Sequence, residues 1–305
     1  MISVIICSAN KNLLKQVSEN ISATIGVPYE IIATDNSDGQ QGICSVYNRG
    51  ILKARYDILC FMHEDVLIKT DNWGQKTVQL FHNDPELGLV GVAGSSYKPV
   101  TPSGWGGTGI DTTYTNLLQS FKYKEKKTKH INRNPNNESI SEVACVDGVW
   151  LCTTRKIARE IMFDENTFWG FHGYDIDFSL SVGQKYKVAV TFEVLLDHLS
   201  EGRYDGTWMK ENLKLHDKWS KHLPVNIEPL TPRQVIYIEK NTFKAFIEQL
   251  IKFEYPISTA FNMLWKNNKF LALDLKLFLK LNFYILKKYL TLDKTRLNSK
   301  QLADG

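Results

Sequence analysis

The segment Tyr56-Asp57-Ile58-Leu59-Cys60-Phe61-Met62-His63-Glu64-Asp65-Val66 decides how the rest of the chain is interpreted. Its apolar run has the length of a buried strand and stops at three polar side chains that can bind a metal ion or a proton. In open α/β sheets, ligands bind beyond the carboxyl ends of parallel strands. We therefore treat His63, Glu64 and Asp65 as a candidate site, with a polar turn between two strands as the alternative.

The residues before this segment predict alternating strands and helices. Apolar, β-branched runs at 2–6 and 29–34 have strand character, and a helix is expected over 43–54. Another helix is indicated by the spacing of Leu13, Leu14, Val17 and Ile21. The order strand, helix, strand implies a parallel sheet, so we predict an α/β, Rossmann-like, mostly parallel sheet flanked by helices.

The loops after the first two predicted strands bear on the ligand. Asp35 follows the second strand, where a carboxylate can accept hydrogen bonds from a ribose or a base NH; a turn residue bonded to its own backbone is the alternative. Residues 8–12 contain no glycine. This absence argues against a dinucleotide fingerprint or a phosphate-binding P-loop at that position.

Four segments together resemble the nucleotide-sugar half of family 2 glycosyltransferases, which have the GT-A fold. They are 3–10, 30–38, 47–51 and the triplet 63–65, in the family's order and spacing. The resemblance implies that Asp65 ligates Mn²⁺ or Mg²⁺, as in an Asp-x-Asp motif. It also implies a nucleotide-sugar site that includes Ser8, Asp35, Asn48, His63 and Glu64. His63 stands where the family has its first acid, and Tyr47 where an arginine is usual.

A second motif, at 168–179, resembles the Trp-Gly-x-Gly-Gly-Glu-Asp-x-Asp motif of galactosyltransferases and the shorter Glu-Asp motif of family 2 enzymes. By this match Asp175 is the general base, with helix capping as its alternative role. Tyr174 replaces the family's glutamate, and Trp169 and Tyr174 are assigned to acceptor binding. Asp177 is expected to cap a helix over 176–183.

Residues 95–142 are rich in Gly, Thr, Asn and Lys and predict a long loop, which inside a compact domain is usually either functional or disordered. Within it Trp105, set among glycines, is a candidate platform for an acceptor sugar or simply a packed turn residue. Asp147 interrupts a strand-like run at 142–152 and is either a contact of the donor sugar or part of a β-bulge.

The resemblance adds two residues near the end of the predicted sheet. His198 follows a strand predicted over 187–196 and sits where GT-A enzymes often supply a histidine as a second metal ligand. Arg203 lies in a short glycine-flanked loop that is expected to close over the donor and meet its diphosphate.

Composition bounds the class of protein. The 305 residues are 43% hydrophobic and 23% charged, which allows one large domain with an extension. Five cysteines without close pairs are expected to be reduced, no opening signal-peptide pattern is visible, and no apolar run is long enough to span a bilayer. We therefore expect a cytoplasmic protein.

Charge is distributed unevenly along the chain. The net charge is +4, but 231–305 carries 13 Lys/Arg and 6 Asp/Glu, so this part has a charge of +7 and the first 230 residues have −3. A slightly acidic body argues against a nucleic-acid partner.

The prolines within 224–232 predict a linker between a catalytic domain, 1–223, and a basic helical extension, 233–305. Helical patterns occur at 242–253 and 269–289. Four lysines line one face of the second: Lys269, Lys276, Lys280 and Lys287. The alternatives are peripheral contact with an anionic membrane, packing on the catalytic domain and pairing in a homo-oligomer.

The combined interpretation is an inverting, metal-dependent glycosyltransferase of polysaccharide biosynthesis. It would use a nucleotide-diphosphate sugar, expected to be UDP-linked, and a saccharide or lipid-linked saccharide acceptor. One alternative is a metal-dependent sugar-phosphate nucleotidyltransferase, although residues 8–14 lack the glycines of its usual loop. The other is a non-catalytic saccharide-binding module, suggested because His63 and Tyr174 replace family acids.

Overall fold

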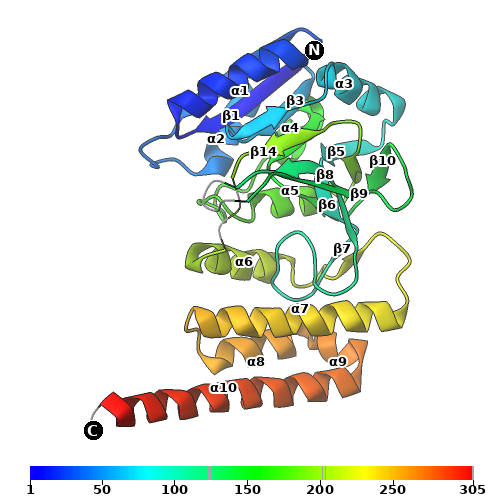
Figure 1. Ribbon diagram of the computed structural model, residues 1–305. Coiled ribbons are helices and arrows are strands. Elements are labelled where there is room, and N and C mark those ends of the chain that lie inside the picture. The colour runs from blue at the N-terminus through cyan, green and yellow to red at the C-terminus, as the bar shows by residue number, and fades with distance from the viewer. Residues whose placement is uncertain (122–125, 201, 203, 304–305) are drawn as a thin grey trace.

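The computed structural model describes residues 1–121, 126–200, 202 and 204–303, with the backbone alone over 292–303. Its centre is a seven-stranded sheet in the order β10-β13-β5-β12-β3-β1-β2 (Figure 1). The strands are β1 (Ile2–Ser8), β2 (Tyr29–Asp35), β3 (Ile58–Met62), β5 (Leu87–Gly91), β10 (Ile140–Glu142), β12 (Trp150–Thr154) and β13 (Lys187–Thr191). The β1–β2, β1–β3 and β5–β13 pairs are parallel, whereas β12 runs antiparallel to β3 and β5, and β10 to β13. The sheet is therefore mixed, not mostly parallel as predicted.

Helices cover both faces of this sheet, which confirms the predicted α/β class. They are α1 (Lys11–Thr24) and α3 (Trp73–Asn83) on one face, and α2 (Ile43–Lys53), α4 (Arg155–Ile161) and α5 (Tyr174–Val182) on the other. Because side chains alternate along β1, Val4 joins the core with Val17 of α1, while Ile5 joins the opposite core with Ile51 of α2. Thr154 caps α4 by accepting the Ile157 N–H at 3.2 Å.

A second, smaller sheet was not anticipated from the sequence. Its order is β11-β6-β8-β14-β4, and β9 pairs with β8. The strands are β4 (Val66–Ile68), β6 (Ala93–Ser95), β8 (Thr113–Gln119), β9 (Lys129–Arg133), β11 (Cys145–Val146) and β14 (Leu196–His198). The prediction of a long loop over 95–142 is thus wrong, because this range contains strands β8 to β10. β8 was missed because its sequence contains several polar residues and lacks a clear apolar pattern. It nevertheless buries Tyr114 in one core and Leu117 in the other.

The chain crosses between the large sheet and the small one several times, and we call three of these connections the crossover segments. Residues 63–65 join β3 to β4, 147–149 join β11 to β12, and 192–195 join β13 to β14. The first two segments lie side by side because Met62 pairs with Trp150 across β3 and β12 and His63 donates its N–H to the Val149 carbonyl. β4 pairs with β14 in turn, so these segments and the end of β14 meet at one place.

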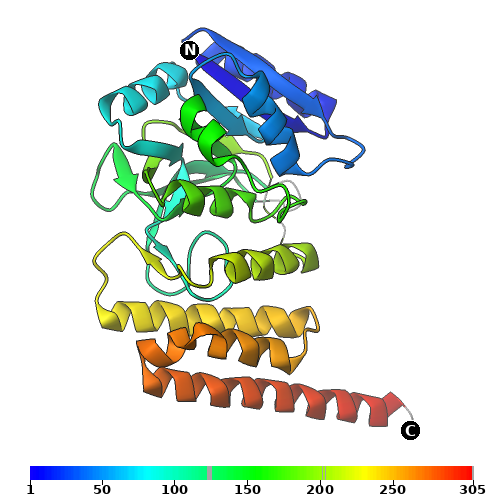
Figure 2. The same cartoon turned by 180° about the vertical axis from the view of Figure 1, so that it is seen from behind.

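The residues after the large sheet form stacked helical layers, visible in Figures 1 and 2. α6 (Gly206–Trp219) is followed by β15 (Val225–Asn226), α7 (Pro232–Lys252), α8 (Ile257–Trp265), α9 (Lys269–Leu273) and α10 (Leu275–Ala303). β15, inside the segment predicted as a linker, pairs with β7 (Tyr97–Lys98). The helix predicted from 269 to 289 is interrupted at Asp274, which accepts the Leu277 N–H at the start of α10. Within the described part of the chain, no helix is long and apolar enough to cross a membrane.

A buried polar network fastens α7 to the body of the protein. Glu239 of α7 is fully buried and accepts hydrogen bonds from the Tyr97 hydroxyl and the Val100 N–H, both at 2.8 Å. Nearby, the Lys98 ammonium lies 3.0 Å from His216 Nε2 of α6, and burial lowers the pKa of Lys98 to about 8. The helical extension therefore docks through specific polar contacts as well as apolar packing.

Candidate active site

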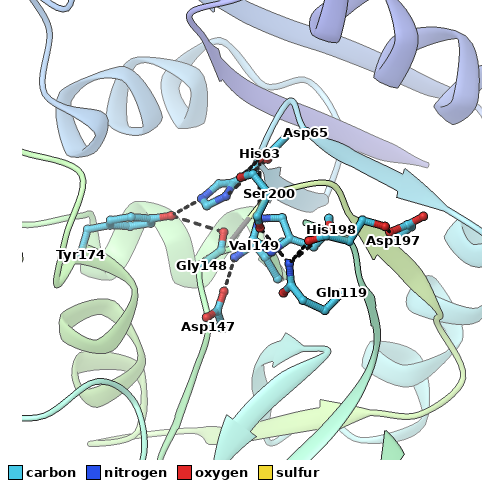
Figure 3. Close-up of polar contacts among 11 residues, drawn as sticks. His63, Asp65, Gln119, Asp147, Gly148, Val149, Tyr174, Asp197, His198 and Ser200 are labelled. Atoms are coloured by element: carbon cyan, nitrogen blue, oxygen red, sulfur yellow. Dashed lines mark hydrogen bonds and ion pairs between the residues drawn. The ribbon is translucent and has the colours of Figure 1, made fainter. Parts of the chain in front are cut away.

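Three side chains at the crossover segments form a metal-binding cluster: His63, Asp65 and His198 (Figure 3). Their ligand atoms all lie within 4.8 Å of one another, and no other grouping of this kind occurs in the described part of the chain. Asp65 Oδ1 lies 3.9 Å from His63 Nδ1, and Asp65 Oδ2 lies 3.7 Å from His198 Nε2. The β4–β14 pairing and the Leu199 N–H bond to the Asp65 carbonyl bring His198 into place.

The donor set of this cluster fits a divalent transition-metal ion. Two imidazoles and one carboxylate suit Mn²⁺ better than Mg²⁺, because Mg²⁺ prefers oxygen ligands. Burial lowers the pKa of His63, although the charge of Asp65 opposes this, so the ring is held towards its neutral, metal-binding form. Ser200 was not picked out from the sequence, yet its hydroxyl donates to Asp65 Oδ2 and orients that carboxylate.

Tyr174 positions His63 through a short hydrogen-bonded chain. The Tyr174 hydroxyl lies 2.9 Å from His63 Nε2 and donates to the Gly148 carbonyl at 3.3 Å. With that donation made, His63 Nε2 must carry the ring proton, which leaves the Nδ1 lone pair on the side of Asp65. The Tyr174 side chain is 3% exposed, so it orients a candidate ligand instead of presenting a surface to an acceptor as predicted.

Tyr174→Phe is expected to weaken Mn²⁺ binding about tenfold, because the ring of His63 would lose the partner that fixes its tautomer. Isothermal titration calorimetry of the purified protein with Mn²⁺ measures this directly. Tyr186→Phe is the matched control, since that hydroxyl bonds to Glu160 on an exposed surface. Equal Mn²⁺ affinity in all three proteins would restrict Tyr174 to core packing.

Asp175 lies at the start of α5 and contacts the same residue, Gly148, whose carbonyl accepts the Tyr174 hydrogen bond. Its Oδ2 accepts the Gly148 N–H at 3.0 Å. Burial, reinforced by the charge of Asp147, raises the pKa of Asp175 to about 7. A carboxyl group with such a pKa can exchange protons at neutral pH, as a general base must.

Asp147 and Trp105 are held to each other. The Trp105 indole N–H donates to Asp147 Oδ2 at 2.9 Å, while Asp147 Oδ1 accepts the Val149 N–H at 2.9 Å. The segment at Asp147 is thus a connection between two sheets and not the β-bulge considered from the sequence. Trp105 is partly buried and packs against both cores, so its indole is well placed to hold the Asp147 carboxylate in position.

Asp177 does not cap α5, contrary to prediction. It is 2% exposed and forms an ion pair with Lys218 of α6 at 2.7 Å. The Trp219 indole N–H also donates to it at 2.7 Å. Asp177 therefore ties α5, which carries Asp175, to α6.

Two predicted nucleotide contacts, Ser8 and Glu64, bind each other. The Ser8 hydroxyl donates to Glu64 Oε2 at 2.6 Å, and the N–H groups of Ala9 and Asn10 donate to the same carboxylate at 3.1 Å. These bonds hold the end of β1 against the first crossover segment. Asp35 lies exposed at the tip of β2, where hydrogen bonding to the Ser37 side chain and to the Ser37 N–H, the latter at 3.0 Å, lowers its pKa.

The remaining predicted residues lie at different depths. Asn48 is buried in α2, where its amide exchanges two hydrogen bonds of 2.9 Å with the Phe163 backbone. Trp169 is 61% exposed on the loop before α5. Arg203 lies outside the described residues.

Comparisons with known proteins place the chain in a family. Solved structures similar to it include GalNAc-T7 with UDP, GalNAc and Mn²⁺, at 11% identity and a TM-score of 0.49, covering 84% of this chain and 58% of that one. Another is the mannosyltransferase PcManGT from Pyrobaculum calidifontis with GDP-Man and Mn²⁺, at 12% identity and a TM-score of 0.49, covering 85% and 74%. No curated protein sequence matches significantly. A model of the glycosyltransferase-like family matches residues 3–221, well over half of the chain, and the protein therefore belongs to that family.

Proposed function

We propose that this protein transfers a glycosyl group, with inversion, from a nucleotide-diphosphate sugar to a hydroxyl of a saccharide or lipid-linked saccharide. One observation carries the proposal. Asp175, whose pKa is raised to about 7, is linked through Gly148 and Tyr174 to His63 of the metal-binding cluster. A proton acceptor thus lies beside a site for a cation, which is the pairing that glycosyl transfer from a diphosphate requires.

Asp175 acts as the general base in this mechanism. Its carboxylate takes the proton of the acceptor hydroxyl while that oxygen attacks the anomeric carbon of the donor sugar. The bond from the anomeric carbon to the diphosphate oxygen breaks, and its electron pair leaves with the nucleoside diphosphate. Because attack comes from the face opposite the leaving group, the configuration at the anomeric carbon inverts.

His63, Asp65 and His198 would hold a divalent ion, for which Mn²⁺ is the first candidate. When bound, this ion supplies Lewis-acid stabilisation of the charge that develops on the leaving diphosphate. Ser200 and Tyr174 keep Asp65 and His63 in the orientation that binding needs. The exposed carboxylate of Asp35 is proposed to meet the nucleoside, for which a UDP-linked donor is the first candidate.

Thermal denaturation with a panel of UDP-, GDP- and dTDP-sugars tests this function. A donor is expected to raise the Tm of the wild type only when Mn²⁺ is present, because ligand binding to the native state stabilises it. Asp65→Ala should lose that shift. Asp57→Ala is the matched control, since Asp57 pairs with Arg155 at the opposite end of β3.

The same panel distinguishes the alternatives when nucleoside triphosphates and sugar phosphates are included. Stabilisation by a triphosphate, with pyrophosphate released on adding a sugar phosphate, would favour the nucleotidyltransferase. Failure of every nucleotide to shift the wild-type Tm would contradict the proposal and favour a saccharide-binding module. Transfer of the sugar from the stabilising donor to an oligosaccharide, followed by mass spectrometry, would support the proposal.

A further inference from the structure

The last helix of the described chain, α10, carries an exposed apolar stripe. Five residues form it: Leu275, Leu279, Phe283, Leu286 and Leu290. Their spacing of four, four, three and four residues places them along one face of the helix. Phe283, at the middle of the stripe, is 69% exposed.

This stripe is separate from the face that α10 uses for folding. The opposite side of the helix buries Leu277, Phe278, Leu281 and Ile285 in the core that it shares with α7 and α8. Figure 2 shows α10 as the outermost layer, and none of the other helices or strands in the described part of the chain covers its far side. A helix that needed only one apolar face to fold therefore has two.

Trp265 of α8 adjoins the stripe and is itself 53% exposed. Its indole N–H donates to Asn282 Oδ1 of α10 at 3.1 Å, which places the ring at the border of the stripe. An exposed tryptophan with its N–H at a polar edge is typical of residues that lie at a membrane–water interface.

Positive charge accompanies the apolar side chains. Lys276, Lys280 and Lys287 are exposed along one flank of the stripe. Helix α10 has no Asp or Glu between Leu275 and Leu290. Lys288 is excluded from this flank because it pairs with Glu248 of α7 at 3.2 Å.

We propose that this face of α10 docks the protein on an anionic lipid surface. The apolar stripe would enter the boundary between headgroups and acyl chains, and the three lysines would meet lipid phosphates. A second copy of the chain docked through the same face is the poorer partner, because its matching lysines would repel those of the first and residues 275–290 contain no acid to pair with them. The proposal stands on surface chemistry and does not depend on glycosyl transfer.

Co-sedimentation of the full chain with unilamellar vesicles tests the docking. Vesicles of phosphatidylcholine with phosphatidylglycerol are expected to bind the wild type, and vesicles of phosphatidylcholine alone to bind it about tenfold less. The variant Leu279→Ser/Phe283→Ser removes apolar area and should bind the anionic vesicles about tenfold less or weaker still. Lys276→Gln/Lys280→Gln/Lys287→Gln should do the same and lose most of the salt dependence of binding.

Leu52→Ser/Lys53→Gln is the matched control, because it changes an exposed leucine and lysine on α2, far along the chain from α10. Circular dichroism melting verifies that each variant is folded, which is expected because all changed side chains are exposed. Quenching of tryptophan fluorescence by brominated lipid should fall in Trp265→Phe. Three results would each overturn the proposal: no binding of the wild type to anionic vesicles, equal binding by the α10 variants and the control, or a lipid-free dimer that the Leu279→Ser/Phe283→Ser change dissociates.

Discussion

Asp175→Asn is expected to lower kcat for glycosyl transfer by about 10²- to 10⁴-fold, the range for removing a general base. The KM for the donor should change little, since an asparagine oxygen can still accept the Gly148 N–H that now binds Asp175. Steady-state rates with the donor identified by thermal denaturation measure this. Full activity in Asp175→Asn would remove Asp175 from the mechanism.

The pH profile gives a second measure of the same residue. Because the pKa of Asp175 is raised to about 7, wild-type activity should fall as the pH decreases through 7, and the residual activity of Asp175→Asn should lack that step. The folding stability should change with pH in the opposite direction to the activity. The native state holds the Asp175 proton more tightly than the unfolded chain, so its contribution to stability is lost as the pH rises from 4 to 7.

Asp175→Asn should accordingly be more stable than the wild type at pH 8, by about 1–2 kcal/mol in the free energy of unfolding. Asp57→Asn, which changes an exposed carboxylate, provides the control for urea denaturation. Equal unfolding free energies in all three proteins would show that the native environment does not favour protonated Asp175.

Glu239→Ala is expected to reduce the free energy of unfolding by about 2–4 kcal/mol, because the Tyr97 hydroxyl and the Val100 N–H would both be left buried without an acceptor. Glu239→Gln keeps a carbonyl oxygen at that place and should lose less. Urea denaturation monitored by circular dichroism compares the variants.

Glu248→Ala is the matched control on the same helix, since its exposed pair with Lys288 should contribute at most about 1 kcal/mol. A loss in Glu239→Ala no larger than that in Glu248→Ala would assign the docking of α7 to apolar packing alone. The expected difference would instead show that the buried hydrogen bonds of Glu239 contribute to holding α7 on the family-matched body.

The sequence by itself determined the class of the fold and most of the candidate site. Apolar runs identified β1, β2 and β3, and apolar residues spaced three to four apart identified α1, because short apolar runs are typical of strands and that spacing puts side chains on one face of a helix. The triplet at 63–65, together with Asp175 and His198, was selected from local motifs. The sequence also revealed two departures from the family pattern, His63 and Tyr174. Because they are 111 positions apart, nothing in the sequence connected them.

Only the tertiary structure decided what those residues do. It brings His63 and Tyr174 into one hydrogen bond, so the two departures belong to the same arrangement around the metal-binding cluster. It also commits Glu64 to Ser8 and Asn48 to Phe163. The physical reason is that residue spacing reports which side chains share a face of one element, whereas contacts between crossover segments depend on strand order and on a second sheet whose polar strands give no strong periodic signal.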